Sequence, residues 1–250
     1  MCEPGGIMRR SLFSVFVLVV ACARVDAACL DPSPLVHSTM SIARYFNEEE
    51  SKAQPGVAGI RGTGWFLSPR LIVTAAHVVE AMQLSAHEWK DIEMQDGETK
   101  TSVAARLRHF AGHHAEKIAV LELRAAIPDA VVLQRRAEPL IPEESLVSLA
   151  YPNSQLRVAG GRFVQYGDGD KFAGSALLEM YDGNDRLVLD HGASGAAVLD
   201  CDGRVVAVVT TLITRTMSFM SNVIRISTAW QSPNVVAIPI QALEDFSGAE

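Results

Sequence analysis

Two short segments of the sequence carry side chains that could perform acyl transfer. Residues 74–79 read TAAHVV and place His77 after an apolar run, and residues 192–197 read GASGAA around Ser194. An imidazole can accept a proton and a hydroxyl can attack a carbonyl carbon, provided that the fold brings the two together. Because structural histidines and Gly-x-Ser-Gly turns are both common, neither segment is specific alone. Together and in this order, they predict Ser194 as a nucleophile and His77 as its base.

The elements that would position these residues are mostly short strands. From Val57 onward, short runs with high β-propensity recur along the chain and are separated by turn residues. Many short strands with few helices favour a sandwich or a barrel, and we expect helices only at about 76–84 and 240–246. The strands are expected at residues 64–67, 71–74, 102–107, 117–123, 146–150, 162–166, 175–180, 186–189, 197–200 and 205–211.

The two motifs resemble those of the trypsin-like (chymotrypsin-fold) serine peptidases, and most closely those of the bacterial HtrA/Deg-type branch. The resemblance covers roughly residues 56–246, and its motifs are specific as an ordered set. It implies an all-β fold of two six-stranded antiparallel β-barrels, a cleft between them and a short C-terminal helix. Because nothing follows Glu250 in the sequence, we expect no appended PDZ domain. Further segments that carry the resemblance are GTGWFL at 62–67, YP at 151–152, GGRFV at 160–164, GRVVAV at 203–208 and AIPI at 237–240.

The composition of the sequence and the extent of the resemblance together predict the domain boundaries. Residues 28–55 would form an N-terminal lead-in, and residues 56–250 a single peptidase domain. Within that domain the first barrel would span about 56–135, the second about 140–238 and the terminal helix about 240–246. Trp65 and Phe66 are expected to fill the core of the first barrel.

Carried over by position, the resemblance assigns roles at the site. His77 would act as general base and then general acid, Ser194 would attack, and the N–H groups of Gly192 and Ser194 would form the oxyanion hole. Ala196 stands where the family has a second glycine, which is a small change. Ala193 replaces the aspartate that pairs with a new N-terminus in the digestive enzymes, so activation by that route is not expected.

The third member of the triad departs from the family pattern. An aspartate is expected directly before the IAVL strand at 118–121, but Lys117 occupies that position and Glu116 precedes it. A lysine cannot accept the imidazole N–H, and a shift of one residue in a regular strand turns a side chain to the opposite face. Three interpretations stay open: Glu116 substitutes through a bulge, another acceptor reaches His77, or the site is a weak dyad or inactive.

The functional expectation is an exported serine endopeptidase that acts on polypeptides through an acyl-enzyme, without a cofactor. A catalytically silent protein of the same fold that binds polypeptides or a partner is the alternative, and Lys117 favours it. The charge of −7 without a basic stripe argues against a nucleic-acid partner. His109, His113 and His114 are closely spaced, but no Cys or suitably spaced carboxylate completes a zinc site, so no metal is expected.

The N-terminus predicts export. Arg9 and Arg10 precede an apolar run at 12–23, and small residues follow, which is typical of a signal peptide spanning residues 1–27. A competing interpretation is lipoprotein processing, which would leave a lipid anchor on Cys22. No later stretch is long enough for an integral membrane span, so we expect a periplasmic or secreted protein.

Cysteine usage agrees with export. Cleavage after residue 27 would leave Cys29 and Cys201 as an even pair in an oxidising compartment. The two residues would then form a disulfide or remain as two thiols, because spacing alone does not show that they meet.

Overall fold

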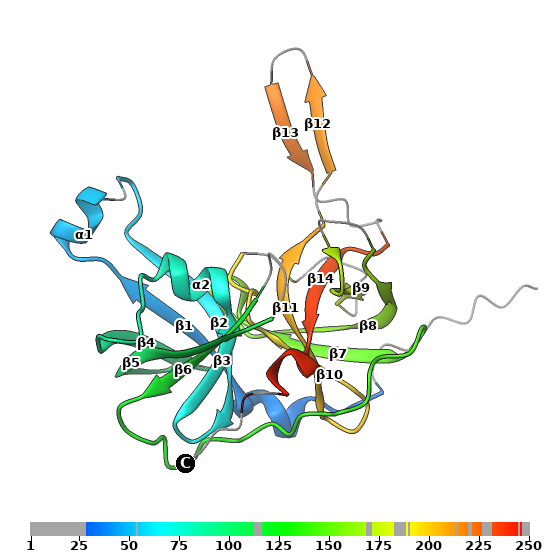
Figure 1. Ribbon diagram of the computed structural model, residues 1–250, viewed down its shortest axis with the longest axis horizontal. Coiled ribbons are helices and arrows are strands. Elements are labelled where there is room, and N and C mark those ends of the chain that lie inside the picture. Colours follow the sequence, from blue (N-terminus) through cyan, green and yellow to red (C-terminus); the bar gives the residue numbers. More distant parts are fainter. Residues whose placement is uncertain are drawn as a thin grey trace, which may run out of the picture.

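Two closed antiparallel β-barrels make up the body of the computed structural model (Figure 1). It describes residues 29–53, 55–112, 117–168, 172–182, 189, 191–213, 215–219, 222–226, 232–244 and 246. The first barrel has the strand order β1-β2-β3-β6-β5-β4, and the second has the order β10-β11-β14-β9-β8-β7. The predicted all-β fold of two six-stranded antiparallel barrels is therefore confirmed.

The strands of the first barrel are β1 (Thr39–Tyr45), β2 (Gly59–Ser68), β3 (Leu71–Ala75), β4 (Lys90–Asp96), β5 (Thr99–Ala111) and β6 (Ile118–Leu123). Those of the second are β7 (Ser145–Ala150), β8 (Arg157–Tyr166), β9 (Ala176–Tyr181), β10 (Ala197–Leu199), β11 (Val205–Leu212) and β14 (Val235–Pro239). A separate ribbon of β12 (Arg215–Phe219) and β13 (Asn222–Ile226) projects from the second barrel between β11 and β14 (Figure 1). The helices are η1 (Ser33–Ser38), α1 (Glu48–Ala53), α2 (Ala76–Ala81), η2 (Pro152–Ser154) and η3 (Ile240–Leu243).

The first barrel begins earlier than the sequence suggested. Strand β1 lies inside residues 28–55, which were expected to be a surface lead-in, and pairs with both β2 and β4 to close the barrel. Six of its seven residues are buried, among them Thr39, Ser41 and Arg44. Arg44 is tolerated there because it donates to the Met82 carbonyl at 2.9 Å and pairs with Glu50. A buried strand is recognised by a run of apolar residues, and these polar residues interrupt that run, so β1 was not predicted.

Other boundaries also differ from the expectations. Strand β4 was not predicted, and β5 extends well beyond 102–107 on both sides. The terminal helix is the 3-10 helix η3, which ends before the expected residue 246. Of the strand expected at 186–189, residues 186–188 lie outside the described part of the chain.

Three apolar clusters hold the fold together. One fills the first barrel, one fills the second, and a third joins residues of both barrels. Phe66 lies in the first barrel as expected, but Trp65 belongs to the cluster between the barrels, together with Val147 of β7. Successive strand residues point to opposite faces, so the two aromatic side chains could not share one core. Trp65 thus helps to fix the barrels against each other.

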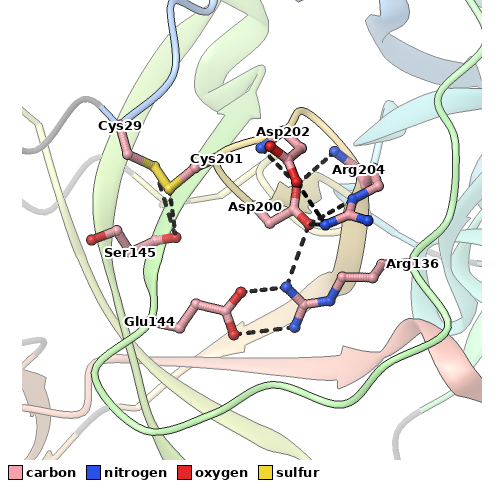
Figure 2. The surroundings of a disulfide bond; sticks show 8 residues. All are labelled: Cys29, Arg136, Glu144, Ser145, Asp200, Cys201, Asp202 and Arg204. Atoms are coloured by element: carbon pink, nitrogen blue, oxygen red, sulfur yellow. Dashed lines mark hydrogen bonds and ion pairs between the residues drawn. A yellow bond between two sulfur atoms is a disulfide. The ribbon is translucent and has the colours of Figure 1, made fainter.

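A disulfide between Cys29 and Cys201 ties the N-terminal segment to the turn after β10 (Figure 2). The two Cα atoms are 5.2 Å apart and 172 residues apart in sequence. Leu30 and Leu35, which follow Cys29, pack on the cluster between the barrels. The segment therefore belongs to the folded body. Within the described residues, no helix has the length and apolar character needed to cross a membrane.

Candidate active site

His77 lies at the start of a short helix that leaves the first barrel. Strand β3 ends at Ala75, helix α2 begins at Ala76, and the Ala76 N–H donates to the Lys117 carbonyl at 2.9 Å. Ala76 and Val78 are buried on either side, whereas His77 is exposed. The strand end thus fixes the backbone of His77 and leaves its side chain at the surface.

The loop that carries Ser194 needs glycine at two positions. Gly192 has φ +97° and Gly195 has φ +94°, a region that residues with a Cβ rarely adopt. A Cβ on Gly192 would lie 2.9 Å from the Tyr151 carbonyl oxygen, and one on Gly195 would overlap the carbonyl of Thr63. Ala193 and Ala196 are buried in the core of the second barrel and anchor the loop. The alanines at positions 193 and 196, which depart from the family pattern, therefore serve packing.

Strand β2 joins the serine loop to the histidine segment. The Thr63 N–H donates to the Ser194 carbonyl at 2.8 Å. A Cβ on Gly62 would lie 2.6 Å from the side chain of Val78 and 3.2 Å from the Ser194 carbonyl oxygen. Gly62 therefore separates the residue that follows His77 from the backbone of Ser194. The fold brings together the two segments that lie more than a hundred positions apart in the sequence.

The hydroxyl of Ser194 has a defined direction. It donates to the carbonyl of Thr210 at 3.0 Å, and the Thr210 hydroxyl donates in turn to the Val236 carbonyl at 3.1 Å. Strands β11 and β14 thus support the serine from the second barrel. A hydroxyl has one proton and two lone pairs, so in this state the proton of Ser194 is directed at the strand.

The peptide groups of the serine loop are held by their carbonyl oxygens. The His191 carbonyl accepts from the Asn153 N–H at 3.2 Å, and the Gly192 carbonyl accepts from the Thr63 hydroxyl at 2.6 Å. In a trans peptide the N–H points away from its own carbonyl, so the Gly192 N–H is directed away from Asn153. Among the described residues, neither the Gly192 N–H nor the Ser194 N–H donates a hydrogen bond. Within the described part of the chain, both are therefore available to an acceptor.

Lys117, which stands at the expected third triad position, lies close to the histidine segment through its backbone. Lys117 is exposed, directly precedes β6, and its carbonyl contacts the residue before His77. Ala75 pairs with Ile118 in the sheet, so the backbone of Lys117 lies beside the histidine segment. Glu116 lies outside the described residues, as do His113 and His114. His109 stacks on Phe246 with ring centroids 5.4 Å apart.

A buried ionic network lies beyond the serine loop, around Asp200 (Figure 2). Asp200 accepts from the backbone N–H groups of Asp202 and Arg204 at 3.0 and 2.9 Å, and from the Arg204 side chain at 3.0 Å. Arg136 bridges Asp200 and Glu144. Burial acts to raise the pKa of Asp200, but the hydrogen bonds from Arg204 and Asp202 outweigh it and hold the pKa below its ordinary value. Asp200 is thus a structural carboxylate that fixes the turn after β10.

Sequence reasoning missed two residues that shape the site. Thr63 and Asn153 hold the carbonyls of the serine loop, and neither is of a type that suggests chemistry. Thr63 stands between Gly62 and Gly64, and this close glycine spacing was the one available signal of crowded backbone. Asn153, with φ +52°, follows Tyr151 and Pro152, and the sequence marked it only as part of a Pro-Asn turn.

Comparisons with known proteins bear on the family and the fold of the chain. A family profile described as the trypsin-like peptidase domain matches residues 62–208, which include both His77 and Ser194. No sequence among the curated proteins matches the chain.

Proteases are among the solved structures that this chain resembles. The Rv3671c protease of M. tuberculosis in its active form superimposes with a TM-score of 0.56 at 16% identity, over 98% of this chain and 91% of that one. Its inactive form gives 0.55 at 17% identity, over 85% and 88%. A variant of the HtrA-type protease AlgW with a tripeptide gives 0.56 at 14% identity, over 85% of this chain and 60% of that one. At such identities the likeness concerns the fold.

Proposed function

The chain belongs to the trypsin-like peptidase family and is a serine peptidase of that type, and from this premise we propose that it is an exported endopeptidase using Ser194 and His77. The observation that carries the proposal is the junction at Gly62, where the segment of His77 and the backbone of Ser194 meet across one strand. Ser-His catalysis requires this meeting, and the two motifs alone could not supply it.

The proposed reaction proceeds through an acyl-enzyme. The Ser194 hydroxyl leaves the Thr210 carbonyl, transfers its proton to His77 and attacks the scissile carbonyl carbon through its oxygen. Collapse of the tetrahedral intermediate breaks the C–N bond, and His77 returns the proton to the leaving amine. Water then attacks the acyl group with His77 as base again, which releases the acid product and restores Ser194.

The oxyanion of each intermediate would bind to the N–H groups of Gly192 and Ser194. Their availability supports this role, because a preorganised donor needs no reorganisation when charge develops. The hydrogen bonds from Asn153 and Thr63 to the neighbouring carbonyls would keep these donors aligned. Loss of one such donor typically lowers kcat by about 10²- to 10³-fold.

Lys117 is the observation that favours a second function. A cation beside the histidine segment disfavours the imidazolium that catalysis needs, and loss of the triad acid lowers kcat on the order of 10⁴-fold in a serine protease with a complete triad. The alternative is a protein of this fold that binds polypeptides in the cleft without cleaving them. The oxyanion hole and the Ser-His pair retain part of the catalysis when the triad acid is lost, and this favours the active enzyme.

We further propose export to the periplasm or the exterior of the cell. The disulfide between Cys29 and Cys201 supports this location, because such bonds persist in oxidising compartments. The proposed signal at 1–27 lies outside the described residues. Mass spectrometry of the mature protein distinguishes cleavage after residue 27 from a lipid-bearing Cys22, and an uncleaved N-terminus on fractionated protein would contradict export by either route.

A fluorophosphonate probe tests the proposed chemistry without knowledge of the substrate. The Ser194 oxygen would attack phosphorus, fluoride would leave, and the proton would pass to His77. The expected result is covalent labelling of the wild type and none of Ser194→Ala. A folded wild type that does not label would support the non-cleaving alternative.

A further inference from the structure

Thr63 lies on β2 of the first barrel, but it forms hydrogen bonds with the serine loop of the second barrel. Its side chain is completely buried. Its hydroxyl donates to the Gly192 carbonyl at 2.6 Å and accepts from the Tyr151 N–H at 3.0 Å. Its backbone N–H donates to the Ser194 carbonyl at 2.8 Å. One residue of the first barrel therefore holds the carbonyls of both Gly192 and Ser194.

The direction of the Thr63 hydroxyl is fixed by its partners. The Gly192 carbonyl can only accept and the Tyr151 N–H can only donate, so the single hydroxyl proton must point at Gly192. The carbonyl of Thr63 is held as well, because it accepts from the Thr74 hydroxyl at 2.7 Å. Thr74 lies on β3, three residues before His77. Thr63 is thus connected to both halves of the proposed site.

We propose that Thr63 is the positioning residue of the oxyanion hole, and this inference rests on the proposed function. The Gly192 carbonyl belongs to the peptide between Gly192 and Ala193, so its orientation sets the course of the backbone into Ser194. Gly192 has φ +97° and no side chain to restrict it, and a freed peptide could rotate. The threonine hydroxyl prevents rotation of the Gly192–Ala193 peptide. The Ser194 N–H, which lies on the next peptide, therefore stays in place relative to the Gly192 N–H.

The same face of β2 is joined to the second barrel at another point. Arg61, two residues before Thr63, donates to the Ser154 hydroxyl at 3.0 Å. Residues two apart on a strand point to one face, so Arg61 and Thr63 both face the Tyr151–Ser154 segment. Asn153 of that segment holds the His191 carbonyl. Strand β2 and this segment therefore both hold the serine loop by hydrogen bonds to its carbonyl groups.

The test compares Thr63→Val, which keeps the shape and loses the hydroxyl, with Thr63→Ser, which keeps the hydroxyl. Thr39→Val is the matched control, because Thr39 is equally buried in the same barrel and its hydroxyl has no partner among the described residues. Each protein reacts with the fluorophosphonate probe over a range of concentrations at 25 °C. This range separates the maximal labelling rate from the half-saturating concentration.

Thr63→Val is expected to lower the maximal labelling rate by about 10- to 100-fold, since small misplacement of reacting groups has effects of this size. The half-saturating concentration should stay within about twofold, and Thr63→Ser should recover most of the rate. Thr39→Val should label like the wild type. If Thr63→Val does not fold, Thr63→Cys replaces it, because a thiol fills similar space and forms only weak hydrogen bonds.

Equal maximal rates in wild type and folded Thr63→Val would overturn the positioning role while leaving the proposed function intact. A loss in Thr63→Val that Thr63→Ser does not recover would also overturn it, because packing would then be the cause. A wild type that does not label at all would instead overturn the proposed function. The two failures are therefore distinguishable.

Discussion

Removal of the disulfide between Cys29 and Cys201 is expected to lower the free energy of unfolding substantially. The bridge closes a loop with a sequence separation of 172 residues, and the chain-entropy relation gives about 5 kcal/mol at 25 °C for a loop of that length. Because measured values often fall below this relation, we expect a loss of about 3–5 kcal/mol in Cys29→Ser/Cys201→Ser. The bond acts mainly on the unfolded chain, so the folded site should change little.

Urea denaturation of the mature protein measures this effect. The midpoint should fall, and the m-value should rise because the unbridged chain exposes more surface when it unfolds. Wild-type protein in a reductant is the control and should match the double variant. A loss below about 1 kcal/mol, with an unchanged m-value, would refute the argument from loop closure.

Two further predictions concern charge. Lys117→Asp should raise the fluorophosphonate labelling rate at least tenfold over wild type and over Lys117→Ala, because an aspartate there could accept the imidazole N–H. A rate no higher than that of Lys117→Ala would place the acceptor elsewhere. The lowered pKa of Asp200 means that its ionised form contributes stability above the ordinary carboxyl pKa of about 3.9, and that this contribution is lost as the pH falls through the lower folded value. Asp200→Asn should therefore destabilise the protein at pH 7, and its stability should depend less on pH below about 4. Thermal unfolding across pH measures both effects. If the stability of the variant falls as steeply with acid as that of the wild type, other carboxyl groups cause the dependence.

The sequence by itself predicted the all-β fold class and singled out the two segments around His77 and Ser194. Short strands bounded by turn residues predicted a sandwich or a barrel, because turn chemistry and β-propensity are local properties, and the family resemblance implied two barrels. Glycine at 192 and 195 was also readable, since a backbone with positive φ favours a residue without a Cβ. The motifs around His77 and Ser194 were recognisable for the same reason: each depends on a few neighbouring residues.

Tertiary structure decided what depends on partners from distant segments. Strand β1 escaped prediction because Arg44 is buried only by virtue of Glu50 and the Met82 carbonyl, which no local pattern reveals. Trp65 joined the core between the barrels because the register of β2 sets which face each side chain takes.

The contacts of the site itself were also beyond the sequence. In the sequence Thr63 is an ordinary strand residue, and only the packing of the second barrel brings the Gly192 carbonyl to 2.6 Å from its hydroxyl. Cys29 and Cys201 were two cysteines of undetermined pairing until the fold brought their Cα atoms to 5.2 Å. Local sequence fixes conformation and reactivity, but a hydrogen bond or a disulfide requires two atoms to meet, and only the packed barrels decide which atoms do so.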